Sequence, residues 1–136
     1  MSHLTKYESN VLVNTDKYLL EDALAELGIT LDSSIKKVKN SYVSTKVDAA
    51  FIMNGKVLSL GIQYVKNNND INTIIVGDDF GTGINQFTFI DQLSQLYKKH
   101  EIIYKCKLEG WTINKEDITV DKDNGDIIIN ASRYAV

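Results

Sequence analysis

Two apolar, β-rich segments joined by a two-residue turn constrain the fold of this chain more than any other feature. Residues 47–53 and 57–65 are the two segments, and Asn54 and Gly55 separate them. Asn-Gly is the pair favoured in a type I′ turn, whose twist matches that of two antiparallel strands. A central β-hairpin is therefore predicted. Its turn fixes a register in which one face of the second strand carries Leu58, Leu60 and Ile62.

Gly61 interrupts the second strand of this hairpin. A glycine inside a strand has no side chain to pack and weakens the strand. Such a residue indicates either a β-bulge or a place where another part of the chain comes close to the backbone. The sequence leaves these two interpretations open.

Further strands are predicted on both sides of the hairpin, where apolar residues alternate with polar turns. They are predicted at 3–12, 34–43, 71–76, 111–120 and 126–131. A polar turn at 66–70 precedes one of them, and Asp123-Asn124-Gly125 joins the last two into a second hairpin. The centre of the chain is therefore expected to be an antiparallel meander of up to about four strands.

Two helices are predicted from their hydrophobic periodicity. In segment 15–27 the apolar residues recur at i, i+3, i+4 and i+7, with Asn14 or Thr15 as the N-cap and Gly28 as a left-handed C-terminal cap. Segment 86–109 carries a broad apolar face and ends before Gly110. At about 1.5 Å per residue this second helix is over 30 Å long, enough to cross the sheet.

These elements predict an α+β fold. A mainly antiparallel sheet of about six to seven strands is expected, with two helices, the second long, packed on one face. The chain has 136 residues, the size of one domain, and neither a linker nor an internal repeat divides it. We therefore expect a single α+β domain over residues 1–136.

Composition excludes several classes of function. The formal charge is −3, and of the 15 basic residues only Arg133 is an arginine, so no DNA or RNA partner is expected. Apolar runs fall short of the ~20 residues needed to cross a bilayer, so no membrane association is predicted. The first residues lack an apolar signal region, and a cytoplasmic location is expected. Cys106 is the single cysteine, which excludes an internal disulfide and indicates an inert thiol.

The segment from Gly77 to Gly83 is the best candidate for a site. It follows the apolar strand 74–76, precedes the long helical segment, and contains three glycines that let another group approach the backbone. Two adjacent aspartates would repel the phosphate that such a turn otherwise attracts. Phe80 has no periodic reason to point inward. The candidate ligand-binding residues are Asp78, Asp79, Phe80, Gly81, Thr82 and Gly83, together with Tyr64 and His3.

Catalytic and metal sites find little support. His3 and His100 could join Asp48, Asp78 or Asp79 in a metal site, but no HxH or HxxxH spacing exists, so no metal and no cofactor is predicted. The Asp78-Asp79 pair suits acid/base work, yet an acidic turn held by side-chain to backbone hydrogen bonds explains it better. No nucleophile elbow or phosphate-binding loop occurs, so no catalytic residue is predicted.

Several segments together resemble one family. They are the start of the chain at 1–6, Leu24-Ala25-Glu26-Leu27-Gly28, the central hairpin, the helix from Phe89 to Gly110 and the closing hairpin from 111 to 129. These segments are similar to the DUF1257 family, also called Ycf35-like proteins. Members occur in plastids, cyanobacteria, other bacteria and phages. The resemblance includes His3 and implies the α+β fold but no catalytic motif. The loops at 67–70 and 77–83 depart from the family pattern.

The sequence favours a non-catalytic binding protein, expected to be a homo-oligomer. In the leading hypothesis it recognises a small polar or nucleotide-like ligand: Phe80 stacks, an aspartate accepts from hydroxyls, and the backbone of Gly81 to Gly83 with the helix N-terminus holds an anion. The abundance of Asn, Ile and Lys is typical of AT-rich genomes; if the source is a phage, sequestering a signalling nucleotide fits. The alternative is a protein-interaction or scaffolding subunit, and a metal- or carboxylate-dependent enzyme ranks third.

Overall fold

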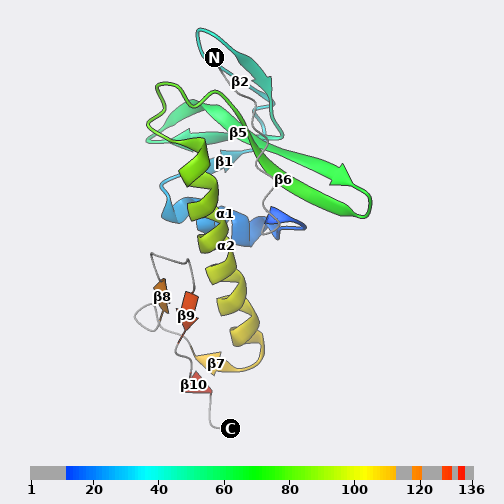
Figure 1. Ribbon diagram of the computed structural model, residues 1–136, viewed down its shortest axis with the longest axis vertical. Coiled ribbons are helices and arrows are strands. Elements are labelled where there is room, and N and C mark those ends of the chain that lie inside the picture. The colour runs from blue at the N-terminus through cyan, green and yellow to red at the C-terminus, as the bar shows by residue number, and fades with distance from the viewer. Residues whose placement is uncertain (1–11, 113–117, 121–126, 130–131, 134–136) are drawn as a thin grey trace.

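The fold is α+β, as predicted, with two helices, the second long, and antiparallel strands (Figure 1). The computed structural model describes residues 12–112, 118–120, 127–129 and 132–133. Its elements are α1 (Lys17–Glu26), β1 (Thr30–Asp32), β2 (Lys37–Lys39), β3 (Ser44–Lys46), β4 (Ala49–Met53), β5 (Lys56–Asn67), β6 (Asp70–Gly77), α2 (Gln86–Leu108), β7 (Trp111–Thr112), β8 (Ile118–Val120), β9 (Ile127–Ile129) and β10 (Ser132–Arg133).

The main sheet has the antiparallel order β1-β4-β5-β6. The predicted central hairpin is confirmed: Asn54 and Gly55 both have positive φ, 53° and 75°, as a type I′ turn requires. The polar turn before β6 is also confirmed, with Asn68 at φ 56° between paired Asn67 and Asp70. The β5–β6 hairpin extends well beyond the other strands of the sheet (Figure 1).

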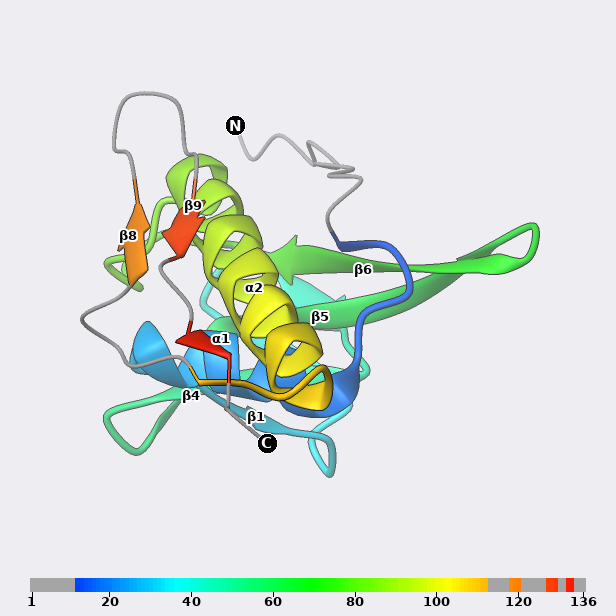
Figure 2. The ribbon, with the colours of Figure 1, turned by 90° about the horizontal axis from the view of Figure 1, so that it is seen from below.

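Both faces of this sheet are covered. On one face Phe51, Leu60 and Ile62 pack against apolar residues of both helices. α2 passes in front of α1 and of the sheet in Figure 2. On the other face Ala50 packs with Val38 of β2 and with Val47. Successive strand residues point to opposite faces, so the central hairpin is buried from both sides.

Gly61 is a point of close approach on the second face. A Cβ there would lie 2.5 Å from the carbonyl oxygen of Ala49 and 2.6 Å from a methyl group of Val47. The β4–β5 register also shifts between Ala50 and Ile52. Both interpretations of Gly61 from the sequence, a close contact and a nearby irregularity in pairing, are therefore confirmed.

The ends of α1 follow local hydrogen bonding. Gly28 has φ 77°, and the N–H groups of Gly28 and Ile29 donate to Ala25 and Leu24, the left-handed cap that was predicted. The predicted N-cap was wrong, since Asp16 caps the helix by accepting from the N–H groups of residues 18 and 19. Asn14 is instead used in long-range bonds to Ile71 of β6.

The strand predicted at 34–43 is confirmed only in part, because it is shorter than expected. The strand is restricted to β2, which pairs with β3 as a separate two-stranded antiparallel ribbon. Asn40 ends it, because its side-chain oxygen accepts from the N–H groups of Tyr42 and Val43 and replaces strand pairing with a turn. The edge strand β1 of the main sheet was not predicted.

Two other predicted segments lie partly outside the described residues. The strand at 3–12 lies outside them except for Leu12, which is buried. The closing hairpin is supported by the antiparallel pairing of β8 with β9, and β7 pairs with β10. The turn at 123–125 lies outside the described residues.

The long helix α2 is confirmed, with Asn85 as its N-cap and Gly110 after its end at φ 84°. Its apolar face is buried only in the first half, at Phe89, Ile90, Leu93 and Tyr97. Near the other end Tyr104 and Leu108 are 52% and 69% exposed. The second half of the predicted apolar face is therefore only partly covered, with Ile103 half-buried and Tyr104 and Leu108 at the surface.

We predict that Gly61→Ala lowers the free energy of unfolding by about 2 to 3 kcal/mol, because the added methyl group collides with the carbonyl of Ala49. Val57→Ala, an exposed position on the same strand, is the control and should change it by less than about 0.5 kcal/mol. Urea denaturation of both variants measures the difference. Equal costs for the two would show that the close approach at Gly61 does not constrain the fold.

Candidate functional site

The loop from Gly77 to Gly83 follows β6, and its first residue, Gly77, has to be glycine. Gly77 has φ 115°, and a Cβ there would collide with the carbonyl oxygen of Ser59 on β5. Ser59 also accepts from the N–H of Asp78 and donates its hydroxyl to the carbonyl of Asp78. The start of the loop is therefore fixed to the central strand.

Asp78 connects this loop to the turn of the β2–β3 ribbon. One carboxylate oxygen accepts from the side-chain amide of Asn40 at 3.0 Å, and the other accepts from the N–H of Phe80 at 3.1 Å. These two hydrogen bonds, the one from Asn40 first, stabilise the charged form and lower the pKa of Asp78. Both oxygens of this carboxylate therefore have partners within the protein, and the carboxylate holds the two loops together.

Asp79 connects the loop to the start of α2. Its carboxylate accepts from the N–H of Gln86, and its carbonyl accepts from both the N–H and the hydroxyl of Thr82. Asn85 accepts from the next two N–H groups of the helix, those of residues 87 and 88. The expected anion at the helix N-terminus would therefore have to displace these side chains.

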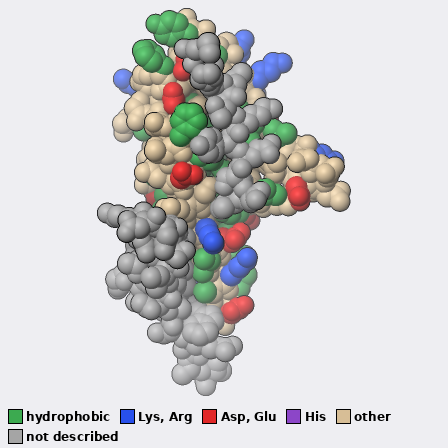
Figure 3. Space-filling view, in the orientation of Figure 1, with side chains coloured by type: hydrophobic (Ala, Val, Ile, Leu, Met, Phe, Trp, Pro, Cys, Tyr) green, Lys and Arg blue, Asp and Glu red, His purple; other side chains and the backbone are tan. Residues whose placement is uncertain are grey.

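The aromatic pair at this loop faces solvent. Phe80 is 70% exposed and Tyr42, on the turn of the ribbon, is 76% exposed, and their rings meet edge to face with centroids 5.9 Å apart. Figure 3 shows hydrophobic side chains at the upper end of the molecule, where Figure 1 places the ribbon and the loop before α2. Tyr42 was not predicted, because only the tertiary fold brings residue 42 beside residue 80.

The ribbon whose turn carries Tyr42 also carries three lysines. Lys37 and Lys46 are directly paired across β2 and β3, and Lys39 lies two residues further along the same face. All three are exposed, whereas Val38 between them is buried. Among the described residues none of these lysines forms an ion pair. We call Lys37, Lys39, Lys46, Tyr42 and Phe80 the ribbon–loop surface.

Comparison with known proteins identifies the family. The family model described as "Protein of unknown function (DUF1257)" matches residues 23–125. The chain belongs to the DUF1257 family. The match covers the ribbon, the loop and all of α2, but not His3. Neither the search of curated proteins nor the search of solved structures found a match.

Two predicted site residues do not join the ribbon–loop surface of this DUF1257 protein. On β5, Leu60 pairs with Gly77 at the start of the loop. Tyr64 lies four residues further along β5, which at about 3.3 Å per residue is roughly 13 Å from Leu60. It lines a separate pocket between α1 and the sheet. His3 lies outside the described residues. Cys106, expected to be inert, is partly buried in α2.

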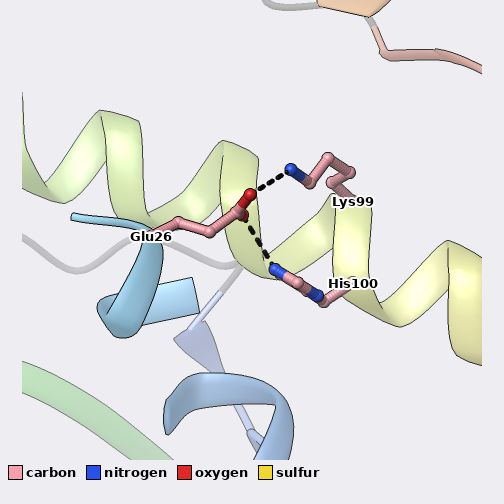
Figure 4. Close-up of polar contacts among 3 residues, drawn as sticks. All are labelled: Glu26, Lys99 and His100. Atoms are coloured by element: carbon pink, nitrogen blue, oxygen red, sulfur yellow. Dashed lines mark hydrogen bonds and ion pairs between the residues drawn. The ribbon is translucent and has the colours of Figure 1, made fainter. Parts of the chain in front are cut away.

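His100 takes part in a contact between the two helices. Its Nε2 lies 2.8 Å from one carboxylate oxygen of Glu26 at the end of α1, and Lys99 Nζ lies 2.7 Å from the other (Figure 4). Among the residues that the structure describes, no three His, Cys, Asp or Glu side chains gather as a metal site would need. Glu26 was not predicted, since the contact joins residues more than 70 positions apart.

Neither helix in the described part of the chain is both long and apolar enough to span a membrane.

We predict that Glu26→Gln lowers the free energy of unfolding at pH 7 by about 0.5 to 1 kcal/mol, a small value because the pair is partly exposed. Burial alone would raise the pKa of Glu26, but the hydrogen bonds from Lys99 and His100 outweigh it and lower the pKa. Because the pKa of Glu26 is lower in the folded state, its carboxylate stabilises the fold at pH values above the ordinary pKa of a glutamate. This contribution is lost as the pH falls through the lowered pKa.

Urea denaturation at pH 7 and pH 3 measures this effect, and the difference between wild type and variant should shrink at the lower pH. Glu101→Gln is the matched control, because the ion pair of Glu101 is with Lys105, at 3.7 Å, within α2 itself. An equal loss at both pH values would contradict the role given to the Glu26 carboxylate.

Proposed function

We propose that this DUF1257 protein is a non-catalytic binding protein that recognises a small anionic, nucleotide-like ligand at the ribbon–loop surface. The observation that carries the proposal is the exposed, edge-to-face pair of Tyr42 and Phe80. Large aromatic side chains exposed to this degree lose the free energy that burial would provide. A planar ring stacked on Phe80 would bury that surface, as bases do on aromatic platforms.

The two loops that carry these rings are already held in place. Asn40 donates to Asp78, which links the turn bearing Tyr42 to the loop bearing Phe80. Asp79 fixes the other end of the same loop to the start of α2. A site whose backbone is ordered before binding loses little conformational entropy when the ligand arrives.

The anionic part of the ligand is assigned to the lysines of the ribbon, not to the helix N-terminus. The first N–H groups of α2 already donate to Asp79 and Asn85. Lys37, Lys39 and Lys46 project from one face of the ribbon whose turn carries Tyr42, and Lys39 is the one nearest that turn. In a protein with a formal charge of −3, such a local patch suits a small anion better than an extended nucleic acid.

The side chains at this surface favour binding over bond-making. Both oxygens of Asp78 accept hydrogen bonds from the protein, and Asp79 is used to cap α2. A general base needs a carboxylate or imidazole that is available to the substrate. Holding a nucleotide without altering it suits the sequestration of a signalling nucleotide, the role expected if the chain comes from a phage.

A protein-interaction subunit is the second candidate, supported by a different observation. Tyr104 and Leu108 are exposed in the second half of α2. A partner or a second copy of the chain would bury this apolar end of the helix. Native mass spectrometry of the purified protein separates the candidates, since it reports the oligomeric state and any retained small molecule in one measurement.

We predict that calorimetric titration with a panel of mononucleotides, dinucleotides and cyclic dinucleotides finds a ligand whose affinity falls by about 5- to 100-fold in Phe80→Ala, the loss typical of one stacked ring. Tyr104→Ala, which removes another exposed aromatic ring toward the far end of α2, is the control and should bind as the wild type does. Lys39→Gln should reduce the salt dependence of binding. No heat from any nucleotide, together with no retained small molecule, would overturn the proposal.

A further inference from the structure

The pocket between α1 and the sheet shares no residue with the ribbon–loop surface. Its volume is about 270 Å³, and it is lined by residues from α1, β1, β4 and β5 and from the segments that follow β1 and precede β4. Lys17 and Lys36 bring two positive charges to its wall, and Glu21 and Asp48 bring two negative charges. The wall of the pocket is therefore electrically balanced but strongly charged.

These four charges do not neutralise one another. Lys17 and Glu21 are one helical turn apart on α1, a spacing that allows an ion pair, yet neither they nor Lys36 and Asp48 form one within the described part of the chain. Lys36 instead donates to the backbone carbonyl of Asp48 at 3.1 Å. The charged groups thus remain available to a bound molecule that carries both signs.

Asp48 and Tyr64 are fixed to each other at one side of the pocket. The carboxylate of Asp48 accepts from the backbone N–H of Tyr64 at 2.7 Å. Tyr64 is 43% exposed, and its ring forms part of the pocket wall. Burial, and then the carboxylates of Asp48 and Glu21, raise the pKa of Tyr64, so its hydroxyl stays neutral at pH 7 and can donate a hydrogen bond.

We propose that this pocket binds a small zwitterion of the α-amino acid class, with a carboxylate directed to the lysines and an ammonium group directed to Glu21 and Asp48. Leu31 and Ala49 complete the wall and offer an apolar contact for a short aliphatic side chain. The volume suits one such molecule and lies just below the range of larger ligand sites, which begins at about 300 Å³. An anionic nucleotide would meet two carboxylates here, so this site is distinct from the ribbon–loop surface.

NMR titration of the ¹⁵N-labelled full-length protein tests the proposal. The probes are L-alanine, L-valine, L-leucine and L-serine, each followed through the backbone N–H signals of Asp48 and Tyr64. At least one amino acid should give saturable shifts at these signals. Its N-acetyl derivative, which keeps only the carboxylate, and its amide, which keeps only the ammonium group, should each bind at least about tenfold more weakly, because each loses one charged contact.

Two variants connect the binding to the named side chains. Glu21→Gln should weaken binding of the amino acid by about tenfold and reduce its advantage over the N-acetyl derivative. Glu101→Gln, an exposed glutamate on α2, is the matched control and should leave both affinities unchanged. Tyr64→Phe keeps the ring and removes only the hydroxyl, and should weaken binding without disturbing the fold.

Three results would overturn the proposal: no saturable shift with any of the four amino acids, equal binding of the two half-charged derivatives, or equal effects of Glu21→Gln and Glu101→Gln. Nucleotide titration of the same labelled samples, followed at Tyr42 and Phe80, reports on the ribbon–loop surface separately. The two proposals can therefore fail independently.

Discussion

Burial of the β4–β5 hairpin from both sides is the constraint on which the rest of this structure depends. Phe51, Leu60 and Ile62 face the helices, while Ala50 and Gly61 face the β2–β3 ribbon. The second face accepts only the smallest side chains, because the chain around Val47 and Ala49 passes almost in contact with the strand backbone. That close approach places the ribbon over the sheet, with its turn, and with it Tyr42, at the end where β6 leads into the loop before α2.

The ribbon–loop surface follows from this packing through a few polar side chains. Asn40 both shapes the turn of the ribbon and donates to Asp78, so one amide group links local structure to a contact between loops. Asp79 continues the connection into α2. Asp78 and Asp79, which the sequence brought to attention, are thus positioning groups, and the exposed side chains around them are aromatic and basic.

Features set by local chemistry could be predicted from the sequence, and features set by distant contacts could not. Asn54-Gly55 and Gly28 act through their own backbone angles, so the central turn and the end of α1 were predicted correctly. The periodicity of α2 identified that helix, although a pattern cannot say which half of an apolar face finds a partner. Asp16 took the capping role because Asn14 bonds to β6, and the pairing of Tyr42 with Phe80 joins residues that no spacing connects.

The uneven burial of α2 divides one continuous helix into two regimes of local stability. Among residues 98–110 none is fully buried, and only Ile102, Ile103 and Cys106 of the apolar side chains are partly buried, whereas the first turns are part of the core. Segments with few buried apolar contacts open at lower free energy than the molecule as a whole. Amide hydrogens along this single rod therefore exchange with solvent in a gradient, slow beside the sheet and fast toward Leu108, and the distal turns can fray while the core stays intact.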